Sequence, residues 1–487
     1  MRLSELLDGF EYDVTRGYGD PVVSGIVYDS RKVVPGCVFI CIKGDRVNSH
    51  DFVASAINAG ARVIVYSEDF NQWDTSVHYV KTPDTRKALA FMSAAWFGHP
   101  AEKLTVIGVT GTKGKTTTTY LIKDMLEKAG YSTGIIGTVG AVIGDEVYHT
   151  PNTTPESFIL QEYFSKMVEK GLTHVVMEAS SQGFLLHRTD GFVFDYGILT
   201  NLSPDHIGPG EHRDMNDYIS CKSMLFRQCK IGIVNADSDY LQEVLKDHTC
   251  ELVTYSINSP SDLKASDIRF ERHGRELGTE FKMEGLLNID AYLCSPGLFS
   301  VYNGLSAAAL GAVMHMGVEH ILTALRETRV KGRIEPVEVS DEFHVLIDYA
   351  HNAMALENLL VTLREYKPKR LVCLFGCGGN RSRLRRFEMG EVSGKYADLT
   401  VITSDNPRFE EPSEIINDIK KGMMKTKGRH IEIEDRREAM RWVLRNAEKG
   451  DIIVLAGKGH EDYQEIKGKR YPMDERVIIK ELMEELG

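Results

Sequence analysis

A glycine-rich loop between an apolar segment and an amphipathic segment constrains the fold of this chain more than any other feature. Residues 104–109 form an apolar run typical of a β-strand. The end of this run and the residues that follow it read Gly108-Val-Thr-Gly-Thr-Lys-Gly-Lys-Thr-Thr117. A helix is predicted from about residue 116 to residue 128, with one apolar face formed by Leu121, Ile122, Met125 and Leu126. Strand, glycine turn and helix in this order predict a phosphate-binding loop in an α/β sheet.

The chemistry of this loop predicts nucleotide binding. Glycines allow backbone N–H groups to turn inward around phosphate oxygens, and the helix N-terminus favours negative charge. Lys115 would add a positive charge near the outer phosphates, and Thr116 would offer a hydroxyl to Mg²⁺. The standard pattern places its first glycine at position 109, which is Val109, so Gly108 and Gly111 are expected to form the turn. The predicted ATP contacts in the loop are Gly111, Thr112, Lys113, Gly114, Lys115, Thr116 and Thr117.

The rhythm of strands and helices divides the chain into three parts. A length of 487 residues exceeds what one hydrophobic core usually serves. We predict an α/β protein with a small N-terminal α/β domain at 1–100, a central P-loop-type domain with a mostly parallel sheet at 101–332, and a C-terminal Rossmann-like domain at 333–487. Further strands are expected at 25–28, 38–42, 62–66, 174–177, 195–199, 231–234, 345–347, 370–375, 400–403 and 451–455.

Composition and charge exclude several classes of protein. A formal net charge of −12 argues against general affinity for nucleic acid, which normally requires a basic face. No apolar run approaches the roughly 20 residues that span a bilayer, and the first residues carry charges without a signal-peptide core. Eight scattered cysteines form no Cys-x-x-Cys pair and are interpreted as buried thiols. We therefore expect a cytoplasmic protein with no membrane or nucleic-acid partner.

Three polar residues after predicted strands or on a helix are candidates for metal chemistry. Glu178 follows the strand at 174–177, where an acid can bind Mg²⁺ directly or through water, or can simply be solvated. His206 follows the next strand and is either another ligand or a structural histidine. Lys222, taken by its pattern alone, is an ordinary lysine on an amphipathic helix.

Together, the motifs resemble those of the Mur ligases of peptidoglycan synthesis, and among them the branch that adds the third amino acid of the peptide. The central part carries Gly-Thr-Lys-Gly-Lys-Thr-Thr, Thr-Asn-Leu-x-x-Asp-His and Asp-Tyr-x-x-x-Lys-x-x-Leu-Phe. The C-terminal part adds Asp348-Tyr-Ala-His351, Phe375-Gly-Cys-Gly-Gly-Asn-Arg381, Asp405-Asn-Pro-Arg408 and Gly457-Lys-Gly-His-Glu461. The first part contributes Asp29-Ser-Arg31, so the resemblance covers nearly the whole chain.

The resemblance implies an ATP-dependent ligase that phosphorylates the D-glutamyl carboxylate of UDP-MurNAc-L-Ala-D-Glu, after which an amine attacks the acyl phosphate. It implies catalytic roles for Lys115, Lys222, His206 and Glu178. Thr116, Glu178, His206 and Lys222 would serve Mg²⁺, with Lys222 carbamylated by CO₂ to an anionic ligand. Asn303, Arg333 and Asp348 match positions near the nucleotide. The chain would be a monomer acting on small molecules.

The resemblance also assigns two substrate pockets. Ser30 matches a uridine-side serine, and the muramoyl dipeptide would contact Asn152, Thr153, Thr154, Ser180 and Arg188. The incoming amino acid would contact Arg381, Asp405, Asn406, Pro407, Arg408, Gly457 and Glu461. The Asp-Asn-Pro-Arg form goes with meso-diaminopimelate, because Arg408 and Arg381 can pair with its distal carboxylate and Glu461 with its distal ammonium. Members with this form can also accept L-lysine, so a lysine-adding ligase stays an alternative.

The chain departs from the family pattern in four places. Residues 207–212 read Ile-Gly-Pro-Gly-Glu-His, where the family typically has Leu-Asp-Tyr-His-Gly. Lys113, Leu186 and Cys221 stand where asparagine, glutamine and alanine are usual. These departures keep open a paralogue that acts on a related peptide. A second hypothesis is a folylpolyglutamate-type or cyanophycin-type ligase, which the first part and the Asp-Asn-Pro-Arg motif disfavour. A third is a nucleotide-gated binding or regulatory protein that has lost ligase chemistry, which the retained Lys115, Glu178, His206 and Lys222 disfavour.

Overall fold

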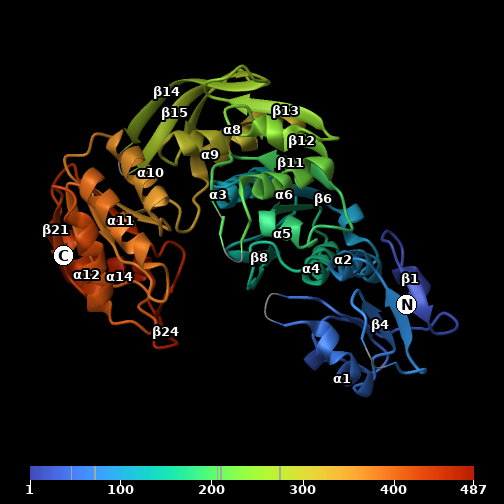
Figure 1. The fold of residues 1–487 in the computed structure, drawn as a ribbon. Helices are drawn as coiled ribbons and strands as arrows, with labels where there is room; N and C mark the ends of the chain where they lie inside the picture. The colour runs from blue at the N-terminus through green and yellow to red at the C-terminus, as the bar shows by residue number, and fades with distance from the viewer. Residues whose placement is uncertain (45–46, 71–72, 206, 209–210, 274–275, 487) are drawn as a thin grey trace. The chain divides into compact units, whose positions relative to one another are not determined.

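The computed structural model describes residues 1–44, 47–70, 73–205, 207–208, 211–273 and 276–486 (Figure 1). Residue contacts divide the chain into two compact units, one formed by residues 1–264 and 305–321 and the other by residues 265–304 and 322–487. Both units are built from helices packed on mainly parallel sheets, which confirms the predicted α/β class. No described helix combines the length and the apolar character needed to cross a membrane.

The first unit begins with a five-stranded sheet in the order β1-β5-β4-β3-β2. Its strands are β1 (Asp13–Arg16), β2 (Ile26–Val27), β3 (Val38–Ile40), β4 (Val63–Tyr66) and β5 (His78–Lys81). All neighbours pair in parallel except β1, which pairs antiparallel with β5. Alternate residues of β3 and β4 contribute to two hydrophobic cores, one shared with α2 (Thr85–Trp96) and the other with α1 (Val53–Asn58). The sheet is therefore covered on both faces.

The second sheet of this unit carries the phosphate loop. Its parallel strands include the order β13-β12-β11-β6-β10-β7, and the start of β14 (Leu263–His273) pairs in parallel with β13. At the other end, β8 (Gly140–Ile143) and β9 (Glu146–Tyr148) extend the sheet antiparallel beyond β7. The parallel strands are β6 (Thr105–Thr110), β7 (Thr133–Gly137), β10 (His174–Glu178), β11 (Phe194–Leu199), β12 (Cys229–Asn235) and β13 (Glu251–Ser256). Its helices include α3 (Lys115–Lys128), α4 (Ser157–Glu169), α5 (Ser181–Leu185), α6 (Met215–Arg227) and α7 (Leu241–Leu245).

The register of this sheet brings three strand ends together. Glu178 at the end of β10 lies beside Val109 of β6, and Leu199 at the end of β11 lies beside Thr110. Helices α4, α5 and α6 share one hydrophobic core with residues of β6, β10 and β11, and most residues of these strands are buried. The carboxyl ends of parallel strands are where ligands bind in such sheets.

The chain enters the second unit within β14 (Leu263–His273), and β15 (Glu276–Gly285) then pairs antiparallel with β16 (Ile289–Leu293). Helices α8 (Leu298–Val313) and α9 (Val318–Glu327) follow. The large sheet of this unit has the order β17-β18-β22-β19-β20-β21, and only β17 pairs antiparallel. Its strands are β17 (Glu335–Val337), β18 (His344–Asp348), β19 (Leu371–Phe375), β20 (Leu399–Ile402), β21 (Arg429–Glu432) and β22 (Ile452–Ala456).

Helices cover both faces of this sheet, as the predicted doubly wound fold requires. One hydrophobic core contains residues of α10 (Ala353–Arg364), α11 (Arg383–Tyr396) and α12 (Pro412–Met423). The other contains residues of α13 (Arg436–Arg445) and α14 (Glu475–Leu486). A separate hairpin of β23 (Tyr463–Ile466) and β24 (Lys469–Pro472) follows β22 and was not expected from the sequence.

Candidate active site

The phosphate loop joins β6 to α3 through two glycines whose positive φ angles other residues rarely adopt. Gly111 has a φ of +145°, and a Cβ there would lie 1.9 Å from Oγ1 of Thr200. Gly114 has a φ of +86° and immediately precedes α3. The expectation that Gly108 helps to form the turn is wrong, because Gly108 lies inside β6, where a Cβ would lie 2.7 Å from the ring of Phe194.

The residues after β11 hold this loop in place. The side-chain amide of Asn201 accepts a hydrogen bond from the backbone N–H of Lys113 and donates one to its carbonyl oxygen, each over 3.0 Å. Thr200 donates its hydroxyl to the same carbonyl over 2.6 Å, and Lys113 Nζ pairs with Asp205 over 3.0 Å. The Thr-Asn pair was not among the predicted site residues, although it stands in the Thr-Asn-Leu motif.

Glu178 is buried, with 2% of its surface exposed. Its Oε1 accepts hydrogen bonds from Thr116 Oγ1 and from the backbone N–H of Thr138, both over 3.0 Å. Its Oε2 accepts the hydroxyl of Thr138 over 3.2 Å. A solvated acid at this position is therefore excluded. A carboxylate beside a threonine hydroxyl is a hard-oxygen pair that suits Mg²⁺.

Lys222 is also buried, with 1% exposed, so its interpretation as an ordinary amphipathic-helix lysine is wrong. Nζ donates to the carbonyl oxygen of Gly111 over 2.9 Å and to Thr110 Oγ1 over 3.4 Å, and lies 4.7 Å from the ring centre of Tyr218. Lys115 Nζ donates to the same Gly111 carbonyl over 2.8 Å. Burial, reinforced by the positive charge of Lys115, holds the pKa of Lys222 well below its usual value. His206 lies outside the described residues.

Four of the predicted dipeptide contacts gather next to Glu178. Thr154 donates its hydroxyl to the Glu178 carbonyl oxygen over 2.8 Å and accepts the backbone N–H of Ser180 over 2.9 Å. Arg188, which is 9% exposed, donates Nη1 to the Thr154 carbonyl oxygen over 3.0 Å. The hydroxyl of Thr153 lies 3.1 Å from that of Thr138. These contacts form a largely buried polar network that continues from Glu178.

The other two predicted dipeptide contacts lie in neighbouring segments. Asn152 directly precedes Thr153 in the turn before α4, and Ser30 begins the short 3₁₀ helix Ser30–Lys32 of the N-terminal sheet region. Asp29 caps that helix by accepting the backbone N–H of Arg31. The assignment of all six residues to the substrate stays a prediction.

The second unit contains the remaining predicted nucleotide contacts. Asp348 ends β18 and accepts backbone N–H groups of Ile334 and Ala350, each over 2.8 Å, and burial raises the pKa of its carboxyl. The guanidinium of Arg333 lies 5.0 Å from the ring centre of Tyr349. Asn303 is buried on α8. Their roles in nucleotide binding stay predictions.

Except for Pro407, which is buried and does not line it, the predicted amino-acid contacts of the second unit line a pocket of about 260 Å³ at the carboxyl ends of β19, β20 and β22. Its wall includes Arg381, Asp405, Asn406, Arg408, Gly457 and Glu461. Arg408 has a left-handed φ of +52°, which costs energy in a residue other than glycine. Its Nε pairs with Glu465 over 3.1 Å, and its Nη1 donates to the Gly379 carbonyl oxygen over 2.8 Å. The contacts of the Arg408 side chain with Glu465 and Gly379 thus hold this strained loop in place.

The sequence-based prediction missed a buried lysine behind this pocket. Lys458 has no exposed surface, and its Nζ donates to Asn406 Oδ1 over 2.7 Å and to the Tyr463 carbonyl oxygen over 2.6 Å. Because Oδ1 of Asn406 is occupied in this way, its Nδ2 faces Glu461 and donates to Oε2 over 2.9 Å. The position of Lys458 in Gly-Lys-Gly-His-Glu is the only signal the sequence offered.

Comparison with known families matches three segments of the chain. Residues 22–102 match the model of the Mur ligase family, catalytic domain, and residues 109–311 match the Mur ligase middle domain. Residues 332–459 match the Mur ligase, glutamate ligase domain.

Individual relatives extend over the whole chain. A protein of Caldanaerobacter subterraneus subsp. tengcongensis named UDP-N-acetylmuramoyl-L-alanyl-D-glutamate--2,6-diaminopimelate ligase is 42% identical and aligns over 100% of this chain and 99% of its own. A solved structure with the same name superposes with a TM-score of 0.71 at 28% identity, covering 95% of each chain. MurF ligase of Thermotoga maritima in complex with ADP shares the fold, with a TM-score of 0.59 at 17% identity over 94% of this chain and 97% of its own. On the strength of the matched domains and this full-length identity, the chain belongs to the Mur ligase family.

Proposed function

We propose that the protein is an ATP-dependent amide ligase that joins meso-diaminopimelate to the D-glutamyl carboxylate of UDP-MurNAc-L-Ala-D-Glu. The name of its 42% identical relative supports this substrate pair. The observation that carries the proposal is the convergence of Lys115 and Lys222 on the carbonyl oxygen of Gly111. A half-buried lysine and a buried lysine at a phosphate loop suit a reaction in which phosphate charge must be neutralised.

The reaction needs a leaving group, because a carboxylate is a poor electrophile. Transfer of the γ-phosphoryl group of ATP to a carboxylate oxygen gives ADP and an acyl phosphate. The amine nitrogen then forms a bond to the acyl carbon, the carbon–oxygen bond to phosphate breaks, and the nitrogen loses a proton. The loop N–H groups and Lys115 would hold the phosphates in line with the carboxylate, which is the main contribution an enzyme makes to such a transfer.

Mg²⁺ would be held by Thr116 and Glu178, whose oxygens lie 3.0 Å apart. When bound, the ion supplies positive charge to the transferring phosphoryl oxygens. Glu178 is kept in position by the backbone and hydroxyl of Thr138, so its carboxylate is oriented before any ligand arrives.

Lys222 would act as a carbamate. Its lowered pKa supplies a neutral amine, and only a neutral amine can form the N–C bond to CO₂ and then lose a proton. The product is an anionic oxygen ligand next to the Gly111 carbonyl, suited to a second Mg²⁺. His206 remains part of the proposed metal and catalytic set.

The amino-acid pocket would select diaminopimelate through its distal end. The guanidinium groups of Arg408 and Arg381 can pair with a distal carboxylate, which L-lysine lacks, and Glu461 can accept a distal ammonium. Asp405, Asn406, Pro407 and Gly457 would complete the pocket. The nucleotide would contact the loop from Gly111 to Thr117 together with Asn303, Arg333 and Asp348.

We further propose that the enzyme is a cytoplasmic monomer with domains at 1–100, 101–332 and 333–487. All eight cysteines are buried and none forms a disulfide in the described part of the chain, as suits a reducing compartment.

One assay tests the function. Purified protein is mixed with ATP, Mg²⁺ and UDP-MurNAc-L-Ala-D-Glu, and each candidate amino acid is added while phosphate release and product mass are followed. Rapid release with meso-diaminopimelate and a product heavier by one amino-acid residue are expected. No release with any amino acid would overturn the proposal. Faster turnover with L-lysine would instead support the lysine-adding alternative, and activity only on another peptide would support a paralogue.

A further inference from the structure

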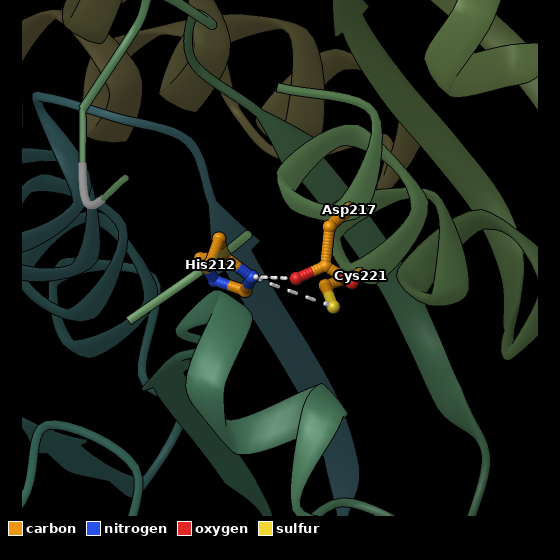
Figure 2. A group of neighbouring side chains, drawn as sticks. All are labelled: His212, Asp217 and Cys221. Carbon is orange, nitrogen blue, oxygen red and sulfur yellow. Dashed lines mark hydrogen bonds and ion pairs between the residues drawn. The ribbon is translucent and has the colours of Figure 1, made fainter. Parts of the chain in front are cut away.

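Two departures from the family pattern meet inside the central fold. His212 ends the unusual stretch at 207–212, and Cys221 stands on α6 where alanine is usual. Figure 2 shows both side chains together with Asp217. His212 Nδ1 lies 3.1 Å from Asp217 Oδ2 and 3.9 Å from Cys221 Sγ. Neither departure takes part in the proposed chemistry, so their contact calls for a separate explanation.

The three side chains bring three possible metal-ligand atoms close together. Asp217 and Cys221 are four residues apart on α6 and therefore lie on the same helix face. One ligand atom from each of the three residues lies within 4.8 Å of the other two. In a tetrahedral zinc site with bonds of about 2.0–2.3 Å, ligand atoms lie about 3.3–3.7 Å apart. The two observed contacts fall on either side of that range.

The surroundings prepare His212 to act as a ligand. Its Nε2 lies 2.8 Å from the hydroxyl of Ser181, and this contact fixes the ring so that Nδ1 faces the cluster. Asp217 also accepts the backbone N–H of Arg213 over 3.2 Å. His212 and Cys221 are buried, whereas the Asp217 side chain is 16% exposed and provides access from solvent.

We propose that His212, Asp217 and Cys221 bind one Zn²⁺ ion at a site distinct from the Mg²⁺ ligands Thr116 and Glu178. Imidazole, carboxylate and thiolate form a donor set that favours zinc, whereas Mg²⁺ prefers oxygen ligands alone. Binding through Nδ1 would use the neutral imidazole with its one proton on Nε2, where it can be donated to the hydroxyl of Ser181. The thiol proton of Cys221 would leave to solvent as the sulfur becomes a thiolate ligand. The ion would then connect the loop after β11 to α6, one residue before Lys222.

Zinc content of the full-length protein tests the site. Protein stripped with a chelator is equilibrated with Zn²⁺ in excess Mg²⁺, desalted and analysed for metal. We expect about one equivalent of zinc per wild-type chain and at least a tenfold loss of affinity in Cys221→Ala and in Asp217→Asn. Cys41→Ala removes another buried thiol of the same unit and should retain the full amount.

Cobalt substitution gives a second readout that does not depend on the variants folding equally well. Wild-type protein loaded with Co²⁺ should show thiolate-to-cobalt charge-transfer absorption, and circular dichroism of each variant reports its fold. Absence of this absorption in the wild-type protein, or zinc retention by a folded Cys221→Ala protein equal to that of the wild type, would overturn the proposal. In that case the three side chains only form hydrogen bonds between the loop after β11 and α6.

Discussion

Lys115 and Lys222 donate hydrogen bonds to the same acceptor, the carbonyl oxygen of Gly111, over 2.8 and 2.9 Å. One lysine comes from the first turn of α3 and the other from α6. Burial lowers the pKa of Lys222, and the nearby positive charge of Lys115 lowers it further. A lowered pKa at Lys222 supplies the neutral amine that the proposed carbamate requires.

The first prediction concerns Lys222→Ala. We expect turnover to fall at least about a hundredfold, because the carbamate ligand is lost, and to recover in part when formate or acetate is added. Phosphate release with and without the added carboxylate measures both effects. Lys230→Ala removes an exposed lysine and serves as the control. Undiminished activity of Lys222→Ala without any added carboxylate would show that no carbamate is needed.

The second prediction concerns Glu178→Gln. The amide keeps the shape of the side chain but removes the charge that would bind Mg²⁺, so the Mg²⁺ concentration for half-maximal activity should rise at least about tenfold. Thr138→Ala loses the hydroxyl contacts to Glu178 and Thr153 but keeps the backbone N–H contact to Glu178, and should show a smaller rise. Both values come from titrations of activity with Mg²⁺. Equal Mg²⁺ dependence in Glu178→Gln and the wild type would remove Glu178 from the metal site.

Apolar runs and glycine turns were sufficient to predict the strands that carry the site. The run at 104–109 corresponds to β6 (Thr105–Thr110), and the helix expected at 116–128 corresponds to α3 (Lys115–Lys128). The strand is buried on both faces and the helix along one stripe, so each has a strong hydrophobic pattern in the sequence. The order of polar strand ends then predicted that the phosphate loop and Glu178 would lie together.

The burial of Lys222 could not be predicted from the same pattern. Its side chain is enclosed because Gly111 and Tyr218 approach it from a distant loop and from the same helix, which is a tertiary effect. Gly108 was misassigned for a related reason, since its missing side chain makes room for Phe194 rather than for a turn. The hairpin of β23 and β24 was missed because its strands are short and largely uncovered.

The third prediction concerns the specificity of the amino-acid pocket. Arg408→Lys keeps the charge but loses the planar fork that can hold a carboxylate with two hydrogen bonds. We expect the KM for meso-diaminopimelate to rise about 10- to 100-fold, which corresponds to the loss of a charge-assisted hydrogen bond, with little change in kcat. Steady-state kinetics with purified substrates measures both constants.

A matched control for this experiment is Arg429→Lys, which changes an exposed arginine on β21. Activity with L-lysine adds a second comparison, because L-lysine has no distal carboxylate for Arg408 to bind. A similar rise in KM for both amino acids would mean that Arg408 supports the loop through Glu465 and Gly379 and does not select the substrate.

The fourth prediction concerns pH and the contact between α2 and the loop after α5. His187 lies between Asp190, at 2.8 Å, and Asp84, at 3.2 Å, and these hydrogen bonds raise the pKa of His187 to about 9. Asp84 caps α2 by accepting the backbone N–H groups of Arg86 and Lys87. Protonated His187 therefore stabilises the folded protein at neutral pH.

The direction of the pH dependence follows from the pKa of His187 in the unfolded and in the folded protein. Unfolded histidine titrates near pH 6.5, so the stabilisation is fully present below about pH 6.5 and is lost as the pH rises through about 9. We expect a loss of about 1–2 kcal/mol, because partial exposure screens the ion pairs. Urea unfolding of the wild type and of His187→Asn between pH 6 and pH 10 measures this loss in the free energy of unfolding. Asparagine is chosen because it tolerates the left-handed φ of +53° at this position. The two proteins should converge in stability at high pH, whereas a constant difference across this range would exclude an effect of the His187 charge.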